Sequence, residues 1–154
     1  MLLLHAILII LHVIFAAAWF GMSLRLTGQA RTAIGASPGI GEALANDGAK
    51  TVKLMGAFIV LTFVFGFAAL ALRGFAMYAW PIHTAVTLLI IMIAVHFFLI
   101  APGWKSVQAA ATGVGQGSHK RIAAGLGISH LLWLITLIFM FWPRLEVGFR
   151  ALTA

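Results

Sequence analysis

The chain has 154 residues, of which 63% are hydrophobic and only 8% are charged, and its mean hydropathy is +1.10. Soluble domains carry about 25% charged residues, so this composition excludes an ordinary soluble protein and indicates an integral membrane protein. The formal net charge of +7 is attributed to membrane topology and lipid contact, and no nucleic-acid partner is expected. Cysteine is absent, which excludes disulfides, thiolate ligands and covalently attached c-type haem.

Four apolar stretches are long enough to cross a bilayer, because a membrane helix needs about 20 predominantly apolar residues. They cover about residues 2–26, 54–72, 80–101 and 121–142. Together they take up most of the chain, which leaves a single transmembrane domain from 1 to 154. The sequence therefore predicts an all-α fold, an integral membrane four-helix bundle with up-down-up-down topology.

The first predicted loop, Thr27 to Lys50, is rich in glycine, alanine and serine, and a short helix is expected over Ile40 to Ala45. The second span contains no ionisable side chain. Gly56 and Gly66 within it are expected to permit close contact with another helix.

The third span begins at Trp80-Pro81 and is expected to stop at Ala101-Pro102-Gly103. The following segment, Trp104 to Ala111, is predicted to lie along the membrane interface as a short amphipathic helix. The fourth span is expected to end at Trp142-Pro143.

Basic residues are distributed unequally between the two sides of such a bundle. Seven fall on the side of the first and third loops: Arg25, Arg31, Lys50, Lys53, Lys105, Lys120 and Arg121. Three fall on the side of the termini: Arg73, Arg144 and Arg150. The positive-inside rule then places both termini outside the cytoplasm of a bacterial inner (plasma) membrane.

Six histidines are the main chemical signal in this apolar chain. His5, His12 and Trp19 are spaced by seven and share one stripe of the first span. At about 1.5 Å rise per residue, His5 and His83 lie about 5 Å from the outer surface, and His12 and His130 lie about 15 Å from it.

Equal depth on facing helices is what a bis-histidine haem requires. The first predicted ligand pair is His12 with His130, and the second is His5 with His83. Ala16 beside His12 and Gly127 beside His130 are small enough to admit a flat macrocycle.

His96 lies deeper, about 24 Å from the outer surface. It is matched either with His119 or with a haem propionate. His119 is the most ordinary of the six, because it lies at the start of a helix in contact with solvent.

Two other interpretations stay open. Any single membrane histidine can simply hydrogen-bond a neighbouring helix. Copper is a weaker alternative to haem, since histidine and methionine both suit it. The three acidic residues lie in loops or tails, which disfavours carboxylate-based acid–base catalysis and a carboxylate-ligated metal site within the membrane.

Two segments resemble the HemJ-type protoporphyrinogen oxidases and the related CopD-like membrane proteins. Leu11-His12-Val13-Ile14-Phe15, followed by Trp19-Phe20-Gly21 and Leu24-Arg25-Leu26, is similar to the first span of that family. Trp80-Pro81-Ile82-His83, with His96 thirteen residues later, is similar to its Trp-x-His span. The resemblance implies a haem b site that uses His12, with Trp19 and Arg25 in the same matching segment.

These observations predict a membrane b-type haem protein, with one or two haems, that transfers electrons to or from a quinone or a membrane redox partner. Whether it is also a haem-dependent oxidoreductase is left open, with protoporphyrinogen IX oxidation as the enzyme alternative. Copper handling and an accessory role in a larger membrane complex are further alternatives. The glycine-bearing helix faces leave a homodimer open as well.

Overall fold

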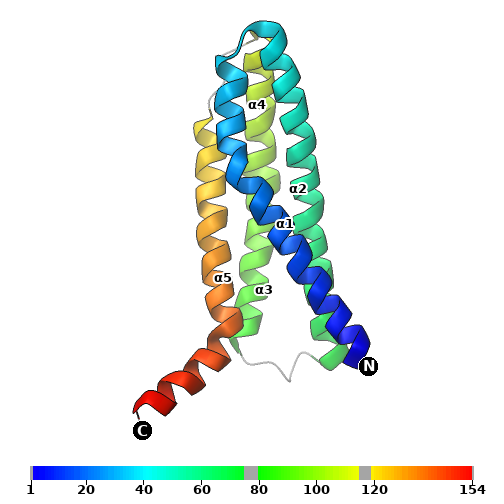
Figure 1. Ribbon diagram of the computed structural model, residues 1–154, viewed down its shortest axis with the longest axis vertical. Coiled ribbons are helices and arrows are strands. Elements are labelled where there is room, and N and C mark those ends of the chain that lie inside the picture. Colours follow the sequence, from blue (N-terminus) through cyan, green and yellow to red (C-terminus); the bar gives the residue numbers. More distant parts are fainter. Residues whose placement is uncertain (1, 75–79, 115–118, 154) are drawn as a thin grey trace.

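The computed structural model describes residues 2–74, 80–114 and 119–153, and these ranges are almost entirely helical. Helix α1 spans Leu2–Gly35, α2 spans Pro38–Arg73 and α5 spans Lys120–Thr153. Between α2 and α5, α3 (Trp80–Val95), the π-helical turn η2 (His96–Ile100) and α4 (Ala101–Ala111) follow one another without a break and form a single rod (Figure 1). No strand occurs within the described ranges.

The four rods are antiparallel neighbours, which confirms the predicted four-helix bundle (Figure 1). Four helical stretches are long and apolar enough to cross a membrane: Leu2–Gly35, Pro38–Arg73, Trp80–Ala111 and Lys120–Trp142. Both ends of the chain lie at the same end of the bundle (Figure 1). The chain is therefore a multi-pass α-helical membrane protein, as its composition predicts.

The helices extend well past the predicted spans. Helices α1 and α2 have 34 and 36 residues. At about 1.5 Å per residue each is about 50 Å long, whereas the hydrocarbon core is about 30 Å thick. We call the end that contains residues 35–38 and 111–114 the basic end, because the predicted cytoplasmic lysines and arginines lie towards it. We call the opposite end, with Leu2, Arg73 and Trp80, the terminal end.

The predicted first loop, Thr27 to Lys50, is wrong, because α1 continues to Gly35 and α2 begins at Pro38. Small side chains explain the difference. Ala30 and Ala33 of α1 are fully buried, and a Cβ on Gly41 of α2 would come within 2.6 Å of the Ala33 carbonyl oxygen. Such close backbone contact stabilises two continuous helices, and proline suits the first turn of α2.

The predicted stop at Ala101-Pro102-Gly103 and the interfacial helix at Trp104 to Ala111 are also wrong. Helix α4 continues the third rod and packs inside the bundle, where Trp104 is 1% exposed. The Trp104 ring lies against Gly48, and its Nε1 donates a hydrogen bond to the Ala45 carbonyl at 2.9 Å. Burial of this large ring keeps the segment in the bundle.

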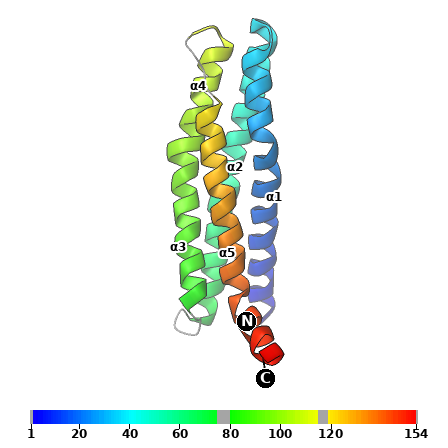
Figure 2. The same cartoon turned by 90° about the vertical axis from the view of Figure 1, so that its left-hand side faces the viewer.

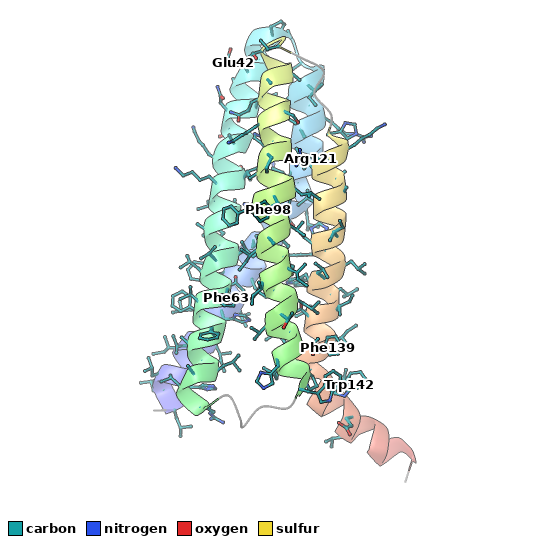
Figure 3. All side chains as sticks on the ribbon, turned by 180° about the vertical axis from the view of Figure 1, so that it is seen from behind. Glu42, Phe63, Phe98, Arg121, Phe139 and Trp142 are labelled. Atoms are coloured by element: carbon teal, nitrogen blue, oxygen red, sulfur yellow. The ribbon has the colours of Figure 1, made fainter. Side chains whose placement is uncertain are left out.

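Pro102 is tolerated within this rod because its missing N–H is compensated. A proline at position 102 leaves the carbonyl of Phe98 without its usual helical donor. The Arg121 guanidinium of α5 donates a hydrogen bond to that carbonyl at 3.0 Å, and Figure 3 labels both residues. The π-helical turn, which ends at Ile100, two residues before Pro102, is a second local adjustment.

Packing is uneven along the bundle. Helix α1 packs mainly on α2, whereas α5 packs mainly on α3 (Figure 1 and Figure 2). Towards the terminal end α1 diverges from α5 (Figure 1). Only 6% of the most apolar window of α1 is buried, compared with 22–28% for the other three candidate spans. The bundle is thus tightly packed near the basic end and more open near the terminal end.

Helix α5 also passes its predicted end at Trp142-Pro143. It continues to Thr153, and its last turns bend away from the bundle (Figure 1).

Candidate functional site

Two glycines of α2 each make room for a histidine ring from another helix. A Cβ on Gly66 would lie 2.6 Å from Nδ1 of His12, and a Cβ on Gly56 would lie 2.8 Å from Nε2 of His96. A residue with a side chain at either position would clash with an imidazole. These glycines were expected to permit close contact between helices, and in the structure they make room for histidine side chains.

Both histidines also hydrogen-bond the backbone of α2, although they use different ring nitrogens. Nδ1 of His12 lies 2.7 Å from the carbonyl oxygen of Thr62, four residues before Gly66. His96 hydrogen-bonds the backbone of Val52, four residues before Gly56. Each imidazole thus lies across a glycine and bonds to the helix one turn earlier.

The hydrogen bond of His12 determines which ring nitrogen carries the proton. A carbonyl oxygen can only accept, so Nδ1 of His12 donates to Thr62, and in the neutral ring Nε2 keeps its lone pair. Nε2 of His12 has no hydrogen-bond partner within residues 2–74, 80–114 and 119–153. Metal-ligating histidines are commonly held in this tautomer by a backbone carbonyl.

His12 lines a cleft of about 320 Å³ between the diverging helices of the terminal half, which we call the histidine cleft. Its polar and sulfur-bearing lining comes from His5 and His12 of α1, Arg73 of α2, and Thr136 and Met140 of α5. The other lining residues are apolar or glycine, and they come from α1, α2 and α3. The cleft thus combines one oriented imidazole with mostly apolar walls.

His5 shares this cleft but does not complete an axial pair with His12. The two residues are seven apart on one helix, which separates them by about 10 Å along its axis. Axial imidazole nitrogens on one iron must approach each other far more closely than that. The other soft donor of the cleft is the sulfur of Met140, which the sequence analysis did not select.

His130 faces a different part of α1. Its Nε2 lies 2.6 Å from Oγ of Ser23, and Ser23 Oγ donates to the Phe20 carbonyl at 2.6 Å. The hydroxyl has a single proton, so both contacts are hydrogen bonds only if His130 donates from Nε2. The ring also packs edge-on against Phe20 and Trp19.

The predicted His12–His130 pair is therefore not assembled in this structure. Ser23 lies eleven residues beyond His12 on α1, a rise of about 16 Å. The equal depths predicted for His12 and His130 are wrong, because α5 continues beyond its predicted end and because α1 crosses the bundle at an angle. As separate ligands, both histidines stay predictions.

The predicted His5–His83 pair is not assembled in the cleft either. His83 is exposed, and its neighbour Ile82 lines the histidine cleft instead. His96 is 1% exposed, lies against Gly56, and its Nδ1 has no hydrogen-bond partner in the described part of the chain. His119 is half-buried just before α5, and no contact between it and His96 occurs among the described residues.

The remaining predicted site residues are scattered. Ala16 is half-buried and Trp19 is 1% exposed, and the Trp19 Nε1 has no partner among the described residues. Arg25 is exposed. Gly127 is also exposed, and a Cβ there would meet nothing within 4 Å, so its small size serves no contact here.

Three residues of the site were not predicted as site residues from the sequence, namely Thr62, Arg73 and Met140, and Gly66 was expected only to permit close helix contact. Arg73 could have been found, because it follows the end of the second predicted span on the same side of the bundle as His5. Thr62 acts through its backbone carbonyl, which every residue type has, so the sequence could not indicate this contact. No group of three or more histidine, cysteine or acidic side chains with metal-binding geometry occurs in the described ranges.

Comparison of the chain with protein-family models, curated proteins and solved structures gives no match. The fold and the cleft therefore define the class by themselves: a four-helix membrane protein with an oriented histidine in an open cleft.

Proposed function

We propose that this chain is a b-type haem protein of the membrane that carries electrons, and that His12 is an axial ligand of the haem iron in the histidine cleft. The observation that supports this is the 2.7 Å hydrogen bond from Nδ1 of His12 to the Thr62 carbonyl. It leaves the Nε2 lone pair on a side chain that lines the cleft.

The chemistry of the cleft suits a haem. A neutral imidazole is a common proximal iron ligand, and the apolar lining matches a macrocycle. The Arg73 guanidinium, at the end of α2, is suited to bind a propionate carboxylate.

The cleft is large enough to enclose part of a haem. Its volume of about 320 Å³ is at the low end of the roughly 300–1,000 Å³ range of small-molecule sites. Ile9, Val13 and Phe67 of its lining are 43–56% exposed, so the cleft is open on one side. A flat ligand would lie partly between these side chains and the surrounding lipid.

Bound haem would supply reversible one-electron chemistry. The Thr62 carbonyl orients His12 and keeps its tautomer, and the apolar walls exclude water. Met140, which lines the same cleft, would be the second residue to hold the iron, in place of the predicted His130, which is hydrogen-bonded to Ser23. A histidine–methionine pair gives a higher iron potential than two histidines.

The electron partner in this proposal is a quinone or a membrane redox protein. The orientation follows from the basic residues of the sequence: the basic end faces the cytoplasm of a bacterial inner membrane, and the termini face outward.

Copper binding is the second candidate, and one observation favours it. His12 and Met140 line one cleft, and imidazole and thioether are ligands that copper accepts. Protoporphyrinogen oxidation stays a prediction of the family resemblance, and complementation of a strain lacking that activity would test it.

The direct test is the absorption spectrum and haem content of protein purified from haem-replete cells. We expect a Soret band that shifts on reduction in the unchanged protein and in His130→Ala, and loss of the bound pigment in His12→Ala. His130→Ala is the matched control, because it removes an imidazole that contacts the same helix outside the cleft.

A colourless and metal-free unchanged protein would overturn the proposal. Pigment lost in His130→Ala but kept in His12→Ala would refute the assignment of the ligand. Copper without haem, lost in His12→Ala, would favour the second candidate.

A further inference from the structure

A second hollow lies on the opposite half of the bundle, between α2 and the rod formed by η2 and α4. It has a volume of about 620 Å³ and shares no lining residue with the histidine cleft. We call it the lysine groove, after Lys53 of α2 and Lys105 of α4, which both line it. It is independent of any cofactor in the histidine cleft.

The lysine groove is polar at one end and apolar at the other. Helix α2 runs away from the basic end and α4 runs towards it (Figure 1). Lys53, Lys105 and Gln108 therefore lie at the end of the groove nearer the basic end, whereas Val60, Leu61 and Phe97 line its deeper, apolar end. This gradient matches the membrane boundary expected from the sequence, since Val60, Leu61 and Phe97 fall within the predicted apolar spans 54–72 and 80–101, and the polar residues at the other end fall outside them.

The two lysines bring uncompensated charge to this boundary. No acidic residue lines the groove, and neither lysine has an ion-pair partner in the described parts of the chain. In Figure 3, long side chains that end in nitrogen or oxygen project from the upper part of the bundle, whereas carbon side chains predominate in its middle part. The groove thus offers two ammonium groups above an apolar trough.

The floor of the groove is preformed. Trp104 lines it and is held in place by the hydrogen bond from its Nε1 to the Ala45 carbonyl. His96, which is 1% exposed and has an unpartnered Nδ1, also lines it beside Gly56. A ligand would therefore meet a fixed surface that includes a buried polar side chain.

From this juxtaposition we infer that the lysine groove binds an anionic phospholipid of the adjoining leaflet, with its phosphate between Lys53 and Lys105 and an acyl chain along Val60, Leu61 and Phe97. A zwitterionic lipid carries its own cation beside the phosphate and gains less from two lysines. Basic pockets between membrane helices on the cytoplasmic side bind anionic headgroups for this reason.

The test is competitive lipid binding to the detergent-purified protein, measured by native mass spectrometry with an equimolar mixture of phosphatidylglycerol and phosphatidylcholine. We expect the unchanged protein to prefer phosphatidylglycerol, and Lys53→Gln/Lys105→Gln to lose roughly fivefold of this preference for each lysine removed. Arg31→Gln/Lys50→Gln is the matched control, because it removes the same charge near the same end from exposed residues outside the groove. It should keep the preference.

A second variant fills the groove without changing charge. Ala57 is exposed and lines it, so Ala57→Trp should reduce the number of bound phosphatidylglycerol molecules while the helical circular dichroism stays unchanged.

Three outcomes would overturn the inference. The first is an unchanged preference in the Lys53/Lys105 variant. The second is an equal loss in the control, which would indicate a diffuse surface field. The third is loss of a co-purified quinone from the Lys53/Lys105 variant with phosphatidylglycerol binding intact.

Discussion

The two histidine–glycine contacts of α2 share one local geometry but lie in different surroundings. His96 at Gly56 is 1% exposed and lies towards the tightly packed basic end, whereas His12 at Gly66 is half-buried and lines the open histidine cleft. The first imidazole is packed into the floor of the lysine groove and is almost completely covered by its neighbours. The second is oriented by the same kind of bond and still reaches an open volume. The difference shows that local geometry orients a histidine, while the packing of distant helices decides whether a ligand can reach it.

The largest loss of stability is expected at the basic end, and it would test the difference in packing between the two ends of the bundle. Trp104→Ala removes a ring that is 1% exposed, packs on Gly48 and bonds the Ala45 carbonyl. We expect a loss of about 3–5 kcal/mol in the free energy of unfolding, as for other buried aromatic residues. Thermal or SDS unfolding of the purified protein measures it.

Trp80→Ala is the control at the terminal end, where the ring is 61% exposed and contacts Phe139. It should cost clearly less than Trp104→Ala. Equal losses from the two substitutions would mean that the terminal end is packed as tightly as the basic end.

A smaller effect should distinguish the two glycines. Gly56→Ala places a Cβ 2.8 Å from Nε2 of His96, whose ring is almost completely covered, so we expect destabilisation of about 1–3 kcal/mol from overpacking. Gly66→Ala places a Cβ 2.6 Å from Nδ1 of His12, but that ring can move into the cleft. It should cost less stability and should displace the ring from the Thr62 carbonyl.

Both glycine variants are compared by unfolding and by pigment content. We expect Gly66→Ala to lose bound pigment and Gly56→Ala to keep it in the fraction that folds. Loss of pigment in Gly56→Ala but not in Gly66→Ala would indicate that His96 is the ligand, and it would contradict the assignment of His12.

The smallest effect is expected at two predicted site residues that face outward. His83→Ala and Gly127→Ala alter exposed positions, and nothing lies within 4 Å of a Cβ at Gly127. We expect His83→Ala to change the free energy of unfolding by no more than about 0.5 kcal/mol, and Gly127→Ala to raise it by no more than about 1 kcal/mol, because alanine favours the helix. Both variants should leave the pigment content unchanged. Loss of pigment in His83→Ala would support the predicted His5–His83 pair after all.

Composition and periodicity were sufficient for the class, the number of spans and the antiparallel order, because hydropathy over about 20 residues reports directly on the bilayer. They failed at Thr27 to Lys50 and at Ala101 to Ala111. Glycine, serine and proline there read as loop signals, but small residues also permit close helix packing, and Arg121 compensates the break at Pro102. Local sequence cannot distinguish these two uses.

For the candidate site, the sequence by itself determined that His12 is an imidazole in an apolar helix, on one stripe with His5. Only the tertiary structure decided that Thr62 orients it, that Gly66 admits it, and that His130 bonds Ser23 instead. Depth counting assumes straight, parallel helices of known length. Because α1 crosses the bundle and the helices extend beyond their predicted spans, His130 meets α1 about three turns away from His12. The hydrogen-bond partner of each histidine is therefore determined by how the helices pack, and residue spacing alone does not give it.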